Sequence, residues 1–163
     1  MKTIKLILLI LVSTVSVGQI RFNDKEYFNF TIAIDPSATI KESSPNLYAK
    51  LELVAKWGYV NVNAQVLPDL LGGYFDYGGA MGLNLTFDTF DTTRAYAGVR
   101  LGTIKRGNES YPLFGFESGI EYNINESYAI GIRATYDYRS DFLYSGADPN
   151  YRGSGFVAFS KKF

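Results

Sequence analysis

The sequence predicts an all-β fold, an eight-stranded antiparallel up-and-down transmembrane β-barrel. Apolar and polar residues alternate with a period of two to the end of the chain, as in strands with two different faces. The alternating segments make up 87 of the 145 residues from 19 to 163, or 60%, which exceeds the strand content of ordinary soluble domains. Nearly all of their charged residues share one face. A closed membrane barrel explains all three observations, because its strands leave no edge unpaired in lipid.

Residues 1–18 have the order of a secretory signal peptide. Two lysines precede an apolar run at 6–12, and small residues follow it up to Gln19. The run is shorter than the ~20 residues that a membrane-spanning helix requires. We therefore expect cleavage before Gln19, rather than a buried helix or a membrane anchor, and an exported barrel domain over 19–163.

Eight alternating segments follow Gln19. Each is long enough for a tilted strand that crosses a bilayer, which needs ~9–11 residues. No helical apolar period interrupts them. The expected strands are residues 27–35, 47–57, 59–67, 77–87, 94–104, 111–123, 127–138 and 153–163.

The two faces of these segments differ in charge. One face carries large apolar and aromatic residues and a single charged residue, Lys161. Alternation alone does not show which face is inside, since a lipocalin-type soluble barrel has the same period with its apolar residues inward. Glycine and alanine interleave with the charges, which suits a crowded lumen, so we expect the apolar face to point outward. The charged face comprises Asp35, Lys50, Glu52, Lys56, Arg94, Arg100, Glu117, Glu121, Arg133, Asp137 and Lys162.

Short and long connections alternate along the chain. Bacterial outer-membrane barrels combine short periplasmic turns with longer extracellular loops, so both termini are expected in the periplasm. The tightest connection is the single residue Gly58, where a slip would reverse the facing of a strand. The expected inner turns are 58, 88–93 and 124–126, and the expected outer loops are 36–46, 68–76, 105–110 and 139–152.

Composition excludes most familiar active-site chemistry. The chain has no Cys and no His, so it lacks thiol nucleophiles, disulfides and the commonest general base and metal ligand. Lys and Arg number 16, as do Asp and Glu, which gives no sign of nucleic-acid binding. Ser154 lacks the spacing of a nucleophile elbow, and the acidic residues near 137–150 match no metal loop. We expect no enzyme activity, no cofactor and no metal site.

The last strand ends in an alternating pattern formed by Val157, Phe159 and Phe163, with Lys161 as the exception. Together with the strand-turn-strand segment 116–133, this pattern resembles small eight-stranded outer-membrane barrels of the OmpA/OmpX type, in particular those of Bacteroidota-like bacteria. The resemblance implies a Gram-negative outer membrane, surrounding lipid, and recognition by the barrel assembly machinery. It also implies that the aromatic residues Phe159 and Phe163 form the assembly signal. Enzymes built on such barrels rely on an active-site His, which this chain lacks.

Counting from the expected periplasmic strand ends predicts an ion network in the lumen. Arg100, Glu117 and Arg133 stand six residues above the ends of three consecutive strands and share the inward parity. Glu117 should then lie between two guanidiniums, with Glu52 approaching from across the lumen. Such a network would plug the lumen, and a gate is the alternative. The expected network comprises Lys50, Glu52, Arg100, Glu117, Glu121, Arg133 and Asp137.

The biological role follows less directly from the sequence than the location does. The favoured role is a non-enzymatic structural or surface-binding barrel that acts through its extracellular loops. The alternatives are an accessory subunit of a larger outer-membrane complex and a narrow channel or small-ligand carrier. Aromatic residues of the outer loops could contact a partner or anchor in lipid headgroups. These residues are Tyr74, Phe75, Phe142, Tyr144 and Tyr151.

Overall fold

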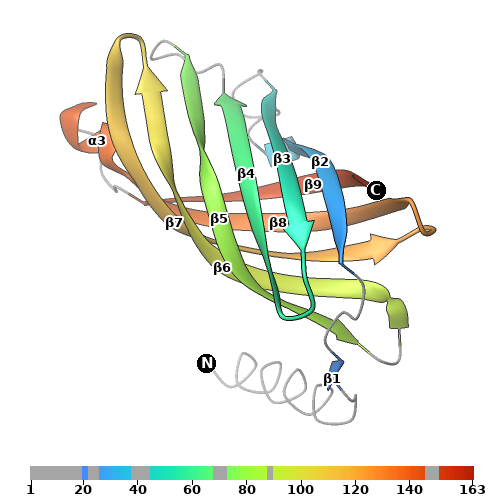
Figure 1. Cartoon of the computed structure of the whole chain (residues 1–163). Coiled ribbons are helices and arrows are strands. Elements are labelled where there is room, and N and C mark those ends of the chain that lie inside the picture. The colour runs from blue at the N-terminus through green and yellow to red at the C-terminus, as the bar shows by residue number, and fades with distance from the viewer. Residues whose placement is uncertain (1–19, 22–25, 38–44, 68–72, 88–89, 146–150) are drawn as a thin grey trace, which may run out of the picture.

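The computed structural model describes residues 20–21, 26–37, 45–67, 73–87, 90–145 and 151–163, and the signal peptide expected over 1–18 lies outside them. The described residues form an antiparallel sheet that curls into a barrel, with the short helix α3 at one end (Figure 1). No helix in this part of the chain is long and apolar enough to cross a bilayer. The elements are β1 (Ile20–Arg21), β2 (Tyr27–Asp35), β3 (Asn46–Val54), β4 (Gly58–Leu67), β5 (Tyr74–Phe87), β6 (Phe90–Arg106), β7 (Glu109–Asn123), β8 (Tyr128–Arg139), α3 (Ser140–Ser145) and β9 (Tyr151–Lys162).

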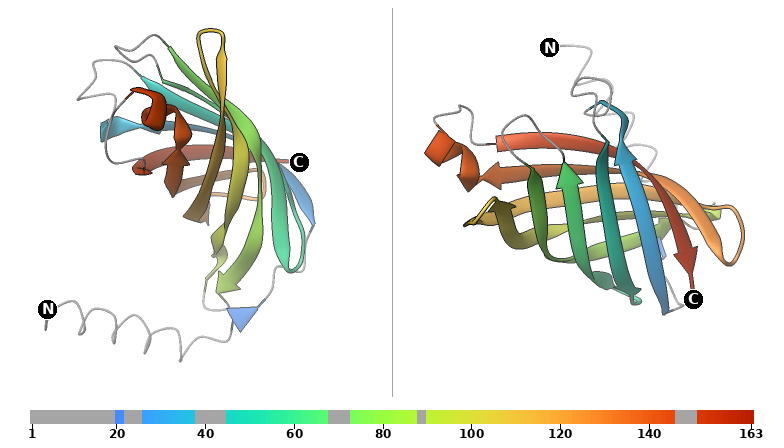
Figure 2. Two further views of the ribbon diagram at one scale, coloured as in Figure 1. Left: turned by 90° about the vertical axis from the view of Figure 1, so that its left-hand side faces the viewer. Right: turned by 90° about the horizontal axis from the view of Figure 1, so that it is seen from above.

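Eight long strands close the barrel. Each strand from β2 to β9 pairs with its neighbours in the sequence, and β9 also pairs with β2, which completes the ring. The predicted eight-stranded up-and-down barrel is therefore confirmed. The two-residue strand β1 adds to the end of β5, opposite Thr86 and Phe87. Figure 2 shows the curvature of the sheet from two further sides.

The β3–β4 hairpin differs from its prediction. β3 ends at Val54, and the Ala55 N–H donates to the Gly58 carbonyl over 2.8 Å across the turn. Gly58 is therefore the first residue of β4 rather than a one-residue connection, because a single residue is too short to reverse the chain. The facing of β4 is as predicted, since Val60 lies opposite Leu53 and both side chains are exposed.

Strands β5 and β6 are longer than predicted, and the loops beside them are shorter. β5 begins at Tyr74 and β6 ends at Arg106. Because Arg106 lies opposite Glu109, the expected loop 105–110 is a two-residue hairpin. Gly107 has a φ of 56°, the left-handed value that such hairpins require at their first central position. The β6–β7 hairpin stands at the upper left of Figure 1.

Side-chain exposure confirms that the apolar face points outward. Val62, Leu83 and Ile132 are 63%, 67% and 62% exposed. Glu52 and Arg100, on the opposite parity, are completely buried. The sheet is therefore inverted relative to a soluble barrel, with apolar side chains outside and charged side chains inside.

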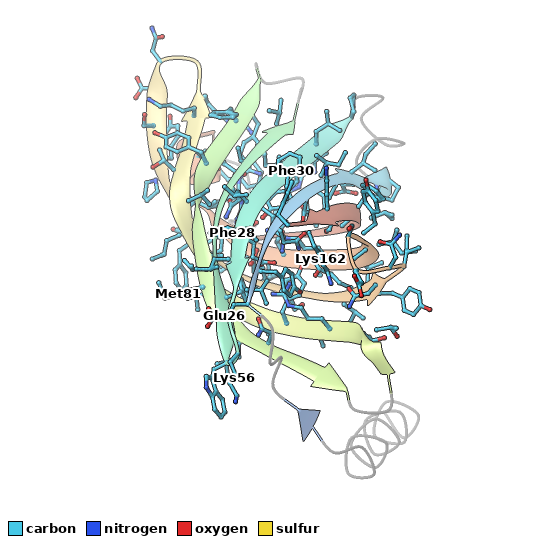
Figure 3. The ribbon with its side chains drawn as sticks, turned by 45° about the vertical axis from the view of Figure 1, so that its right-hand side comes forward. Glu26, Phe28, Phe30, Lys56, Met81 and Lys162 are labelled. Atoms are coloured by element: carbon cyan, nitrogen blue, oxygen red, sulfur yellow. The ribbon has the colours of Figure 1, made fainter. Side chains whose placement is uncertain are left out.

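The lysines near the strand ends depart from this pattern. Lys56 lies in the β3–β4 turn and is exposed, as its position in Figure 3 shows. Lys162 is partly buried and donates to the Asn123 side chain. Lys161, on the apolar face, is exposed at the end of β9 with its ammonium 5.0 Å from the Phe163 ring centroid. A lysine at a strand end can extend its charge toward water, so these positions are compatible with an apolar belt.

Candidate functional site

The charged residues of the lumen form three groups, which we call the lower, middle and upper groups. The lower group joins Lys50 and Glu52 of β3 to Arg94 of β6 and Glu121 of β7. Glu52 accepts from Lys50 Nζ and from Arg94 Nη1, each over 2.8 Å. Arg94 Nη1 also donates to Glu121 over 2.9 Å. Two cations and two carboxylates therefore compensate one another in a buried site.

Glu117 and Arg133 form the middle group. Arg133 donates to Glu117 Oε2 from Nη2 over 2.8 Å and from Nε over 3.2 Å. The second carboxylate oxygen of Glu117 accepts from Asn61 Nδ2 over 3.0 Å. Charge-assisted hydrogen bonds of this kind are stronger than neutral ones, so they hold both side chains in place. The structure thus brings Glu117 to one of the two arginines expected beside it.

Arg100, the other arginine expected beside Glu117, lies in the upper group. It donates to Asp137 over 2.9 Å and forms an ion pair with Asp76. Asn63 Oδ1 also accepts from Arg100, over 3.2 Å. The prediction that Glu117 lies between Arg100 and a second guanidinium is therefore wrong.

The strand register explains this difference. Counting from the strand ends assumed that the ends are level, but β6 pairs with β7 two residues away from that alignment. Arg100 consequently lies opposite Gly115, and Gly115 lies opposite Asp137 of β8. Because glycine has no side chain, Arg100 and Asp137 meet across it, and a Cβ atom at Gly115 would collide with the Asp137 carboxylate.

Aromatic rings pack against the buried cations. Tyr59 and Tyr96 contact each other edge to face, with ring centroids 5.4 Å apart, and Lys50 Nζ lies 4.5 Å from the Tyr96 centroid. Arg133 lies over Tyr48, with its guanidinium carbon 3.7 Å from the ring centroid. These cation–π contacts offset part of the cost of removing the cations from water.

The predicted network omits Arg94 and Asp76. Arg94 has the inward parity and is the first residue of its predicted strand, and it was used only as the end from which Arg100 was counted. Asp76 falls in a predicted outer loop, because its strand was expected to begin at residue 77. Tyr74 and Asp76 are both buried within β5 and continue its inward parity. Had the inward alternation of this strand been continued below residue 77, it would have identified Asp76 as a lumen residue.

Ion pairs join α3 to the strand ends at one mouth of the barrel. Asp141 accepts from Arg139 over 2.8 and 2.6 Å and from Arg106 over 2.7 Å. Ser140 Oγ donates to the Pro112 carbonyl of β7 over 2.6 Å. Burial alone would raise the pKa of the Asp141 carboxyl, but the hydrogen bonds from the two arginines outweigh it and hold that pKa below its ordinary value. We call this arrangement the α3 clamp.

The aromatic residues expected in the outer loops lie in different settings. The expectation is wrong for Tyr74, which is buried beneath a guanidinium 4.0 Å from its ring centroid, because β5 begins at this residue and turns it inward. Phe75 and Tyr151 are exposed strand residues. Phe142 lies in α3 and is partly buried. The Tyr144 side chain lies outside the described side chains.

Phe159 and Phe163 lie at the end of the chain with exposed rings. The Phe163 N–H donates to the Phe28 carbonyl over 2.9 Å, which ties the chain end to β2. Both rings are open to lipid or to a protein partner. Recognition of these residues by the assembly machinery stays a prediction.

The charged side chains of the three lumen groups compensate one another. Every carboxylate of the three groups accepts from a cation. Among the described residues, no cluster of three or more acidic side chains is placed to hold a metal ion. A groove of about 430 Å³ lies over β6–β8, lined by outward side chains that include Val99, Phe116 and Tyr136.

Solved structures of other proteins share this barrel fold. A de novo designed transmembrane β-barrel is similar with a TM-score of 0.57 and 8% identity, covering 87% of this chain and 99% of the design. The outer-membrane protein Ail of Yersinia pestis, whose backbone structure was determined in a phospholipid bilayer nanodisc, is similar with a TM-score of 0.54 and 11% identity. The match covers 85% of this chain and 100% of Ail. Neisserial surface protein A is similar with a TM-score of 0.52 and 12% identity, and the match covers 84% of this chain and 95% of that protein.

The likeness at these identities is one of fold. No protein-family description and no curated protein sequence matches the chain. The neighbours are small membrane barrels, so the resemblance expected from the sequence is confirmed for the architecture. The assignment to a Bacteroidota-like family stays a prediction.

Proposed function

We propose that this protein is a non-enzymatic integral protein of the bacterial outer membrane, with a closed lumen, which serves as a structural or surface-binding barrel through its extracellular side. One observation carries the proposal: exposed apolar side chains surround a lumen of buried, paired charges. Transfer of such a belt from water to lipid is favourable, and the closed ring satisfies the backbone hydrogen bonds without water.

The apolar belt continues around the barrel. Phe30 of β2, Val62 of β4, Leu101 of β6 and Ile132 of β8 are each between 45% and 63% exposed. Soluble monomers rarely expose contiguous apolar patches larger than a few hundred Å². A protein partner normally covers one side of a molecule, whereas lipid covers a whole circumference, so the belt favours a bilayer.

The hairpin lengths support an orientation with both termini in the periplasm. The connections 55–57, 88–89 and 124–127 lie at the same end of the strands as Phe163. At the opposite end, where α3 lies, the connections 36–45, 68–73 and 140–150 are longer, and the two-residue β6–β7 hairpin is the one short connection there. In bacterial barrels the short turns are periplasmic. The proposed signal peptide would direct export, so the mature N-terminus should be Gln19.

The filled lumen favours a structural role over bulk transport. An eight-stranded barrel has an interior just wide enough for side chains, and here three ion-paired groups and their tyrosines occupy it. Ser154 lies within strand β9 and not at a strand-to-helix turn, which supports a non-enzymatic role. An accessory subunit is the second candidate, because β2 accompanies β9 over only part of its length.

Fractionation of native membranes tests the proposal. The mature protein should sediment with the outer membrane, and unheated and boiled samples should migrate differently on SDS gels because a closed barrel resists SDS at room temperature. A variant without residues 1–18 is the control and should stay in the cytoplasm. Recovery of the native protein from the soluble periplasm would overturn the proposal.

Phe163 offers a test of the proposed assembly partner. Its ring is 70% exposed, so Phe163→Ala should leave the stability of the refolded barrel nearly unchanged but slow its appearance in the outer membrane. Phe163→Tyr keeps an aromatic end and is the control. Pulse-chase measurement of the heat-resistant form gives the assembly rate, and an unchanged rate for Phe163→Ala would contradict a recognition role.

A further inference from the structure

The groove on the outer face of the barrel crosses three neighbouring strands of the apolar belt. It has a volume of about 430 Å³ and lies over β6, β7 and β8, which are side by side in Figure 1. All nine residues that line it belong to the described part of the chain. Its outward side chains are exposed, so no described segment of the chain fills the groove.

Small side chains form the floor of the groove. Ala97 of β6 lies opposite Ser118 of β7, and Ser118 lies opposite Ala134 of β8. The three residues therefore stand in one row across the strands, and all three side chains are exposed. Because none of them is longer than a hydroxymethyl group, the row is a depression in the outer surface.

Larger side chains form the two walls. Val99, Phe116 and Tyr136 stand opposite one another in the next outward row toward the β6–β7 hairpin. Ile120 and Ile132 stand opposite each other in the next outward row in the other direction. These five side chains are between 38% and 62% exposed, so they project from the barrel on both sides of the floor.

The aromatic rings of one wall are held away from the floor. The Phe116 ring contacts the Phe114 ring edge to face, with centroids 5.7 Å apart. The Tyr136 ring stacks on the Tyr151 ring, with centroids 5.4 Å apart. Phe114 is two residues farther from the floor than Phe116, and Tyr151 lies opposite Tyr138, two residues beyond Tyr136. Aromatic pairs of this kind are favourable contacts, so the rings keep the groove open.

The width of the groove determines what can enter it. Phe116 and Ile120 are four residues apart on β7, which is ~13 Å along a strand, and their side chains extend into that span. An α-helix with its side chains is ~10–12 Å across, so a helix of a partner protein would rest on the walls. A second copy of this barrel would approach with a convex surface and also miss the floor. An extended acyl chain is narrower than either.

We propose that this groove holds one acyl chain of a membrane lipid, an inference that rests on the membrane location proposed above. The outward side chains of the lining carry no charge, which suits an acyl chain. A chain in the groove contacts the floor and both walls, whereas a chain on the convex belt contacts protein on one side only. Dispersion attraction grows with the number of contacts, so this lipid should stay bound while the surrounding lipid exchanges.

Nuclear magnetic resonance tests the proposal on the mature protein extracted from native outer membranes into perdeuterated detergent. In that solvent, protonated acyl chains come only from lipid that co-purifies. Native mass spectrometry should show one retained lipid per chain, and its acyl methylene protons should give nuclear Overhauser effects to the Ala97 and Ala134 methyl groups. Ala64 is the internal control and should give none, because it lies on β4, opposite Tyr77 and outside the groove.

Two variants fill the floor of the groove. Ala134→Leu and Ser118→Leu should each lower the fraction of chains with a retained lipid by roughly tenfold or more, since even one extra methylene in an apolar pocket changes binding by such a factor. Val62→Leu is the matched control, because it enlarges an exposed side chain on β4, and it should retain the lipid. The heat-dependent gel shift verifies folding. If neither floor variant folds, the contacts of the unchanged protein decide alone.

Four outcomes would overturn the proposal. They are the absence of a retained lipid from the unchanged protein, a retained lipid without contacts to Ala97 and Ala134, undiminished retention in both folded floor variants, and a co-purifying protein that contacts these two methyl groups. Fractionation and the gel shift report the membrane location independently. A barrel that resides in the outer membrane but retains no lipid would therefore refute this inference and leave the proposed location intact.

Discussion

Glu117 is held in the lumen by Arg133 and Asn61. Glu117→Ala should lower the free energy of unfolding by about 3–5 kcal/mol, because the buried guanidinium of Arg133 would lose its counter-charge. Arg133 Nη1 already lacks a hydrogen-bond partner among the described residues, so no nearby acceptor is placed to replace the Glu117 carboxylate. Urea unfolding of the barrel in lipid vesicles measures the loss.

The double variant Glu117→Ala/Arg133→Met is the matched control. It removes both charges and leaves no isolated ion in the lumen, so it should recover much of the lost stability. The ion-pair explanation would be contradicted if the double variant were as unstable as the sum of its two single variants.

Ile132 tests the facing of the strands. It is 62% exposed at mid-height of β8, opposite Ile120 and Val157. An arginine at the bilayer midplane costs ~2–4 kcal/mol, and the cost falls to ~0–1 near the interfaces. Ile132→Arg should therefore destabilise the barrel far more than Tyr128→Arg, at the first residue of the same strand. Equal unfolding free energies for the two variants in vesicles would refute the outward assignment.

The α3 clamp should make the conformation of the barrel mouth at which it lies depend on pH. The lowered pKa of Asp141 means that its ion pairs are fully formed above the ordinary carboxyl range near pH ~4 and are lost as the pH falls through the lowered pKa. The amide resonances of Ser140 and Phe142 in nanodiscs should shift over this acidic interval. Asp141→Asn should produce the acid-state shifts already at neutral pH, and resonances unaffected by this substitution would rule out the clamp.

The elements were predictable where a local pattern determines them. β2 has the predicted bounds, 27–35, because its alternation is complete and Pro36 follows it. The β3–β4 and β6–β7 connections differ from prediction because turn geometry, not strand alternation, fixes where a hairpin closes. The same limit applies to the lumen. Alternation assigned Glu117 and Arg100 to the interior correctly, but their partners depend on the stagger between strands, which no single strand encodes.

At the scale of the whole molecule, the barrel combines an apolar exterior with a lumen closed at several heights. The lower, middle and upper groups occupy the interior, and the α3 clamp lies at one mouth. The apolar exterior and the charged lumen could be predicted from the sequence, because the residues of each strand alone determine which of its faces is apolar. The incomplete β2–β9 pairing did not, since it depends on how far two strands distant in the sequence run together.

Conductance separates the closed barrel from the narrow-channel alternative. Wild-type protein in planar bilayers should show no steady single-channel current, because side chains fill the lumen. Glu117→Gln removes the charge of the middle group but keeps a side chain of similar size, and the ion pairs of Arg94 and Arg100 remain in the other two groups. The variant should therefore fold, as its heat-dependent gel shift would show, and stay non-conducting. A folded Glu117→Gln barrel with raised conductance would instead identify the Glu117–Arg133 pair as a gate and favour the channel role.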